Sequence, residues 1–201
     1  MKRILLITFL MISSFAMAQK MKVTKGDFKF LKGQKEINVE FVYDNLQLMK
    51  ENLSNDEYVT KRAAELNEKN KGNGDRWKKK WEESPDHMWN PKFLELINKY
   101  YGEPKKVNIQ EGIETAKYTL IVDAVWIYPG WDIAISKKGA KVSTVLRFVE
   151  TANPSNVLLE ITSKDAPGDQ WGSNFSNESR IAEGFAKTAK SLAKMMEKNV
   201  K

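Results

Sequence analysis

The segment 126–132 combines large aromatic rings, a Pro-Gly turn and a carboxylate, the residue types that best suit binding chemistry in this chain. Loop aromatics lose little conformational entropy when they are ordered, and they often anchor ligands or partner proteins. We therefore take the following residues as candidates for ligand or partner binding: Trp126, Tyr128, Trp131 and Asp132.

A second loop, 165–169, contains two aspartates and is followed by Trp171, which joins the candidates. If both loops meet at one end of a sheet, they would form an aromatic, acidic rim suited to a glycan or a peptide. The alternative is that these tryptophans close the ends of a hydrophobic core, where large aromatic side chains are common.

Carboxylates near strand ends could also act on a sugar, because glycoside hydrolysis uses two carboxyl groups about 5–9.5 Å apart. Asp132 and Asp169 are the residues for such a pair. For Asp123 we favour a structural role, a cross-strand ion pair with Arg147 on a sheet face that also carries Glu160. The sequence assigns no catalytic residue, so we expect a protein that is not an enzyme.

Other catalytic and cofactor chemistries lack the residues that they need. The chain has no cysteine, which excludes thiol catalysis and cysteine-ligated zinc. It has one histidine, His87, whereas a metal site built on histidine needs several ligands at defined spacing. No glycine-rich dinucleotide or phosphate-binding motif is present. We expect no metal and no cofactor.

The first eighteen residues have the pattern of a secretory leader. Two basic residues precede an apolar run over 4–15, and Ala16-Met17-Ala18 provides a small-x-small cleavage site. The run is shorter than the about 20 residues that cross a bilayer. We expect cleavage near Ala18–Gln19 and a periplasmic or secreted protein. Gln19 stands where a lipoprotein needs cysteine, and no later run could span a membrane, so we expect no membrane anchor.

The chain is basic, with 33 Lys and Arg against 26 Asp and Glu and a formal charge of +7. Most of the basic residues are lysines mixed with acids, whereas recognition of bases and phosphates favours the arginine fork. Trp77 and Trp81 flank three lysines at helical spacing, a pattern that favours inward packing over stacking on nucleic acid. We therefore expect no nucleic-acid partner.

The first half of the chain reads as strand followed by helices. Alternation predicts strand from Gly26 onwards, through Phe28 and Phe30, and again over 37–43. Ser54 and Glu57 have the spacing of a capping box. The predicted helices are 54–70, 75–83 and 90–101, the last capped by Asn90 and stopped by Gly102.

The second half changes to period two. Strands are predicted over 118–128, 142–150 and 157–162, followed by an amphipathic helix over 178–198. The apolar residues of these strands share one face, which we assign to the core: Leu120, Val122, Ala124, Trp126, Val142, Leu146, Phe148, Val157, Leu159 and Ile161. This pattern favours an antiparallel sheet covered by helices on one face.

Four segments resemble a family of uncharacterised secreted proteins of Gram-negative bacteria. They are Tyr118-Thr119-Leu120-Ile121-Val122, 126–131, 141–150 and Ile181-Ala182-Glu183-Gly184-Phe185-Ala186-Lys187. More loosely, the order of elements is similar to small periplasmic α/β modules: the curli secretion lipoprotein, the activator lipoproteins of cell-wall synthases, and the N-terminal domain of TolB. The resemblance implies a partner-binding role in the envelope and brings no catalytic residues.

We therefore expect an α+β fold, a mainly antiparallel sheet of four or five strands with helices on one face, in the order β-α(α)α-β-β-β-α. Residues 19–201 would form a single domain with a helical insertion at about 54–101. The expected function is a non-catalytic binding or assembly module whose partner is an envelope protein or glycan. The alternative is an enzyme that acts on envelope polysaccharide through loop carboxylates.

Overall fold

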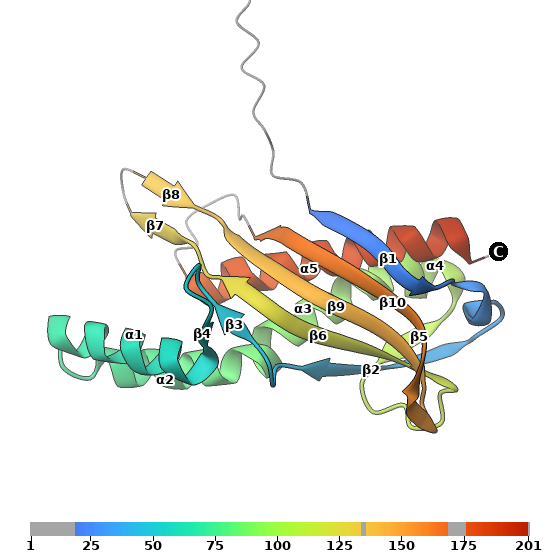
Figure 1. Ribbon diagram of the computed structural model, residues 1–201, viewed down its shortest axis with the longest axis horizontal. Helices are drawn as coiled ribbons and strands as arrows, with labels where there is room; N and C mark the ends of the chain where they lie inside the picture. Colours follow the sequence, from blue (N-terminus) through green and yellow to red (C-terminus); the bar gives the residue numbers. More distant parts are fainter. Residues whose placement is uncertain (1–18, 134–135, 169–175, 201) are drawn as a thin grey trace, which may run out of the picture.

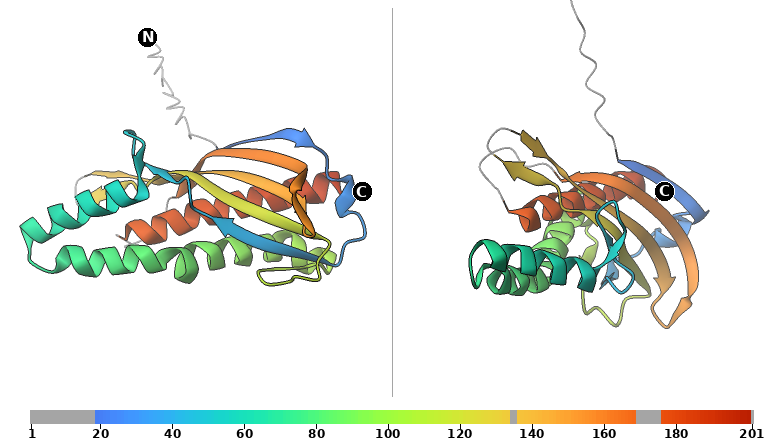
Figure 2. Two further views of the ribbon diagram at one scale, coloured as in Figure 1. Left: turned by 60° about the horizontal axis from the view of Figure 1, so that its bottom comes forward. Right: turned by 60° about the vertical axis from the view of Figure 1, so that its left-hand side comes forward.

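The computed structural model describes residues 19–133, 136–168 and 176–200, and it shows an α+β protein. A twisted sheet forms one layer, and the helices over 90–97 and 177–199 pack on one of its faces (Figure 1, Figure 2). The predicted α+β class is confirmed. Among the described residues, no helix is both long and apolar enough to cross a membrane.

The described residues contain ten strands. They are β1 Lys20–Gly26, β2 Glu36–Val42, β3 Gln47–Leu48, β4 Leu53–Ser54, β5 Asn108–Gln110, β6 Tyr118–Tyr128, β7 Trp131–Ile133, β8 Ser136–Lys138, β9 Ala140–Glu150 and β10 Asn153–Gly168. The main sheet has eight strands along the path β1-β10-β9-β6-β2-β5, with β3 beside β6 and β4 beside β3. β7 and β8 form a separate hairpin.

The prediction of four or five mainly antiparallel strands is wrong, because the sheet is larger and mixed. β2 runs parallel to both β5 and β6, and β3 runs parallel to β6. Parallel neighbours need a crossover connection, which the helices between β4 and β5 supply. A period-two pattern assigns residues to faces but does not reveal the direction of pairing, so it could not distinguish these arrangements.

β1 and β5 form the two ends of the strand path. β1 pairs antiparallel with β10, with a bulge at Thr24. The Gln19 side chain donates to Ser163 Oγ at 2.8 Å and accepts from Ser191 Oγ at 2.6 Å, which fixes the start of β1. The strand predicted from Gly26 onwards is wrong, since β1 ends there and the chain continues into a 3-10 turn, Lys29–Leu31.

Five α-helices lie in the described residues. They are α1 Asn55–Lys69, α2 Asn73–Ser84, α3 Asn90–Ile97, α4 Glu103–Lys105 and α5 Asn177–Asn199. The predicted capping box opens α1: Ser54 Oγ accepts from the backbone N–H of Glu57, and Glu57 accepts from the backbone N–H of Ser54. These bonds satisfy backbone donors that a helix start otherwise leaves without partners.

α3 begins at Asn90, the predicted start, but the predicted cap there and the predicted end at Gly102 are wrong, because α2, α3 and α4 follow one another without a break. π-helical turns, Pro85–Trp89 and Asn98–Gly102, join them. The backbone N–H of Asn90 bonds to the Pro85 carbonyl, five residues earlier. Each π-helical turn is followed within two residues by a proline, Pro91 or Pro104, whose missing N–H and ring disturb regular α-helical bonding to the preceding turn.

The core lies between the sheet and the helices α3 and α5. The residues of the predicted core face that are almost fully buried are Leu120, Val122, Ala124, Val142, Leu146, Phe148, Leu159 and Ile161. α5 contributes Ile181, Phe185 and Leu192 to the same cluster. α5 packs against β9, β10 and α3.

Two residues assigned to the core face differ: Val157 is only partly buried and is separated from Leu159 by a bulge, and the assignment of Trp126 to the core face is wrong. The pairing of β6 with β9 shifts by one residue between Ala124 and Trp126, so Trp126 faces Ser143 and Ile127 faces Val142. A bulge of this kind moves the following side chains to the opposite face of a strand. Ile127, with no exposed surface, takes the core position instead.

α1 and α2 form an arm that projects beyond one end of the sheet, at the end where β7 and β8 lie (Figure 1, Figure 2). Aromatic rings attach this arm to the core. Trp81 contacts Tyr58, Trp77 and Trp89 with ring centroids 5.2–5.5 Å apart, and Trp89 stacks on Phe185 at 5.9 Å. Trp77 and Trp81 therefore pack inward, as their helical spacing predicts.

Candidate functional site

A cleft of about 400 Å³ lies where the arm, the β3–β4 hairpin and the turn from β6 into β7 come together. Its volume falls within the range of small-molecule sites, about 300–1,000 Å³. Both polar and apolar side chains line it: Met49, Glu51, Leu53, Tyr58, Lys61, Arg62, Glu65, Trp131 and Asn177, together with Gly130.

α1 forms one wall of the cleft. Its lining residues are Tyr58, Lys61, Arg62 and Glu65, at positions i, i+3, i+4 and i+7, so they lie along one face of the helix. The capping box fixes where α1 begins and hence which face is turned to the cleft. Sequence reasoning missed this wall. The sequence does carry a signal for this wall, because one tyrosine and three charged residues recur at helical spacing. We interpreted the segment only as a capped helix.

Trp131, a predicted binding residue, forms the opposite wall. It is 39% exposed, and among the described residues it has the only large hydrophobic side chain that is exposed rather than buried or half-buried. Gly130 places it there: Gly130 has φ +68°, and a Cβ at this position would lie 2.2 Å from the Lys138 carbonyl oxygen. Glycine allows both the left-handed backbone and the close approach of the two chains. The β7–β8 hairpin can therefore turn away from β6 at this point.

Trp126 and Tyr128 do not line the cleft, although they were predicted to bind with Trp131. Trp126 Nε1 donates to the Met49 carbonyl at 2.8 Å, and the Met49 N–H donates to the Ile127 carbonyl at 3.0 Å. Tyr128 stacks on Trp126 with the centroids 6.4 Å apart, and Lys138 Nζ lies over its ring. Trp126 thus supports the β3–β4 hairpin that carries Met49 into the cleft.

The remaining predicted site residues fall where the structure gives no side-chain description. Asp132 is placed as part of strand β7, but its side chain lies outside the described residues. Trp171 and Asp169 lie wholly outside them. The prediction of a loop from Asp165 is wrong for its described part, because residues 165–168 are the end of β10, where Gly168 pairs with Ala140 at the start of β9.

The electrostatics of the cleft come from paired and buried groups. Arg62 Nη1 lies 3.1 Å from Glu65 Oε2, with the two side chains 35% and 45% exposed. Burial raises the pKa of the Tyr58 phenol to about 12, an effect that the neighbouring Arg62 guanidinium reduces. The phenol therefore stays protonated near neutral pH and can both donate and accept a hydrogen bond.

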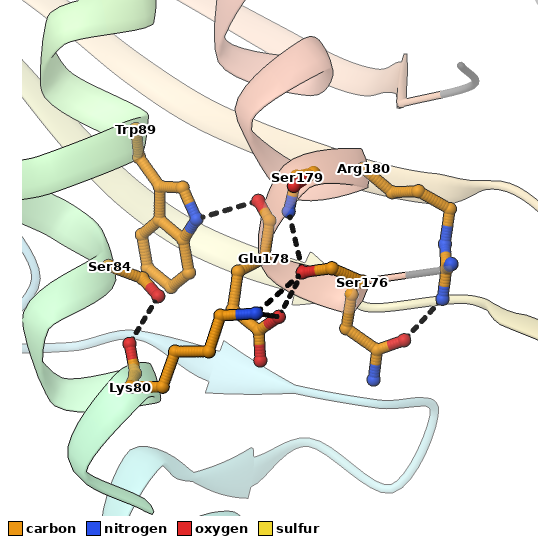
Figure 3. Close-up of polar contacts among 8 residues, drawn as sticks. Lys80, Ser84, Trp89, Ser176, Glu178, Ser179 and Arg180 are labelled. Carbon is orange, nitrogen blue, oxygen red and sulfur yellow. Dashed lines mark hydrogen bonds and ion pairs between the residues drawn. The ribbon is translucent and has the colours of Figure 1, made fainter. Parts of the chain in front are cut away.

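Polar contacts join the start of α5 to the end of α2 and to the turn that follows it (Figure 3). Glu178 is 3% exposed, and its side chain pairs with Lys80 Nζ at 3.3 Å and hydrogen bonds with Ser176. Trp89 Nε1 donates to the Glu178 carbonyl at 3.0 Å. These contacts join α5 to the arm. They also hold Asn177, which lies between Ser176 and Glu178, at the edge of the cleft.

The Asp123, Arg147 and Glu160 side chains form an ion-pair network on the sheet face away from the core. Arg147 lies 3.0 Å from Asp123 and 3.3 Å from Glu160. Thr24 donates to Glu160 at 2.8 Å, which extends the network to β1. Each residue of the network thus contacts a residue of a neighbouring strand, the structural role that we favoured for Asp123.

Within 19–133, 136–168 and 176–200, no three His, Asp or Glu residues gather as potential metal ligands. No model of a protein family matches the chain, and a search of curated proteins also finds no match. Among solved structures, PelC dodecamers from Paraburkholderia phytofirmans are similar to it. One covers 87% of this chain and 97% of its own, with a TM-score of 0.38 and 10% identity. A variant of that PelC has the same TM-score and 11% identity.

Proposed function

We propose that this protein is a non-catalytic binding module of the cell envelope, which holds its ligand or partner between α1 and Trp131. The observation that carries the proposal is the exposure of Trp131, 39%, at the mouth of a formed cleft. Exposed aromatic side chains beside a concave surface are common anchors in binding sites.

Two features of the cleft suit binding rather than proton transfer. The pKa of Tyr58 is raised away from the neutral range in which general acids and bases work best. Arg62 and Glu65 pair with each other, which holds both side chains in place before a ligand arrives. The leader pattern of residues 1–18 supports a location outside the cytoplasm.

The test compares Trp131→Ala with the wild-type protein, using the exported chain and envelope fragments from the bacterium that produces it. Co-sedimentation with these fragments should be lost in Trp131→Ala, while the protein stays folded with a small fall in the thermal unfolding midpoint, because the side chain is partly exposed and lies on a hairpin outside the main sheet. Lys137→Ala, an exposed position on the same hairpin, is the matched control and should bind normally. Equal binding by wild type and Trp131→Ala would refute the proposal.

A further inference from the structure

The charges of the cleft indicate a class of ligand, and this inference rests on the proposed function. Lys61 and Arg62 provide two positive charges, while Glu51 and Glu65 provide two negative ones. A strongly anionic chain would meet the carboxylates, and a strongly cationic chain would meet the basic groups. Like charges brought together oppose binding, so the balanced lining favours a ligand without net charge.

The polar groups of the cleft favour a ligand with many hydroxyls. A guanidinium has five N–H donors and a carboxylate about four acceptor positions, and the bond from Arg62 to Glu65 at 3.1 Å uses one of each. Both groups are planar and present two polar atoms side by side, so each can form a bidentate pair of hydrogen bonds with two adjacent polar atoms of a ligand. Hydroxyls both donate and accept, so neighbouring hydroxyls can use the carboxylate and the guanidinium together.

The apolar part of the lining adds a further requirement. Trp131 offers a ring, and Met49 and Leu53 offer aliphatic surface, within reach of the same cavity. A ligand that fills the cleft must therefore carry C–H surface as well as hydroxyls. A pyranose ring has both, with C–H groups on its faces and hydroxyls around its edge.

We infer that the cleft between α1 and Trp131 binds a neutral oligosaccharide, with one sugar ring against Trp131 and its hydroxyls bonded to Arg62 and Glu65. The cavity of about 400 Å³ has the size of a small-molecule site. An extended peptide is the competing ligand. Peptides recognised by strand addition depend on main-chain hydrogen bonds. Four of the ten lining residues belong to α1, whose backbone groups bond within the helix.

The test applies the full exported chain to an array of neutral, acidic and basic oligosaccharides and of unstructured peptides, followed by calorimetry on the best neutral saccharide. Trp131→Ala should weaken that binding about tenfold or more, and Trp131→Tyr, which keeps an aromatic ring, should retain most of it. Glu65→Ala should weaken it several-fold, while Glu68→Ala, exposed on the same helix outside the lining, should have no effect. Affinity should change less than about twofold between 0.05 and 0.5 M salt, because no ion pair with the ligand forms.

Two results would overturn the inference: no neutral saccharide binds, or one binds equally well to Trp131→Ala. If acidic polymers, basic polymers or peptides bind instead and depend on Trp131, the saccharide assignment fails and the proposed function stands. If neither the array nor the envelope fragments distinguish Trp131→Ala from wild type, the proposed function fails as well.

Discussion

Replacing Gly130 by alanine tests how the chain turns into the β7–β8 hairpin. Gly130 has φ +68°, a left-handed conformation that costs a residue with a Cβ about 1–2 kcal/mol. The added Cβ would also lie 2.2 Å from the Lys138 carbonyl oxygen and 2.8 Å from the Ala140 nitrogen. Both atoms belong to backbone, so the hairpin must shift, at about 1–3 kcal/mol. We expect a total loss of about 2–5 kcal/mol.

Gly33 and Gly112 provide matched controls. Both have φ +78°, and an added Cβ at either position meets nothing within 4 Å. Their alanine variants should therefore carry the backbone penalty alone, about 1–2 kcal/mol. The three variants are compared by urea unfolding with a common slope, which gives differences in the free energy of unfolding. The Gly130→Ala loss should exceed both controls by at least about 1 kcal/mol. Equal losses at the three positions would refute the close approach as the reason for glycine at 130.

Three further changes test other parts of the structure. Asp123→Asn removes a charged partner of Arg147 and should lower the free energy of unfolding by about 1–2 kcal/mol in urea; saccharide binding should stay intact, and a loss of binding would contradict a structural role. Trp126→Phe keeps a ring but removes the donor to the Met49 carbonyl. It should lower stability by about 1 kcal/mol and weaken saccharide binding, and unchanged binding would show that Met49 needs no such support. Burial, with a contribution from Asp86, raises the pKa of Glu111 above its ordinary value of 4.5, which destabilises the folded state at higher pH. Glu111→Gln should therefore raise the unfolding midpoint slightly at about pH 7 and have no effect below about pH 4; a constant difference across this range would exclude titration as the cause.

The long strands could be predicted because their side chains alternate between a buried and a wet face. β9 alternates in this way over most of its length. β6 runs from Tyr118 to Tyr128, the predicted range, because a long run of strand-forming residues marks it even though both of its faces are largely buried. β1 has two partly buried apolar residues, Met21 and Val23, among lysines, and this signal was too weak to identify it. The bulge before Trp126 has no signature in the sequence pattern, so its shift to the other face could not be foreseen.

Among the helices, too, local contacts could be predicted and long-range arrangements could not. The capping box at Ser54 is a local contact between residues three apart, and it formed as predicted. The helix predicted to stop at Gly102 continues through a π-helical turn into α4, which contains Pro104, so the usual rule that glycine and proline end a helix failed there. Trp131 was identified as a site residue because it lies in a conspicuous loop. Tyr58 and Glu65 were not, because the cleft that they line exists only once the arm folds beside the hairpin.

The strands at the two ends of the sheet path, β1 and β5, bear on resistance to aggregation through strand edges. Unpaired strand edges are templates for aggregation, and natural proteins protect them with lysines, bulges or very short strands. β1 carries three exposed lysines, Lys20, Lys22 and Lys25, and its bulge interrupts regular pairing. β5 has three residues, too few to template a long partner. Acetylation of the β1 lysines would remove their charge and with it part of this protection, so colloidal stability at high concentration depends on a strand that does not line the cleft.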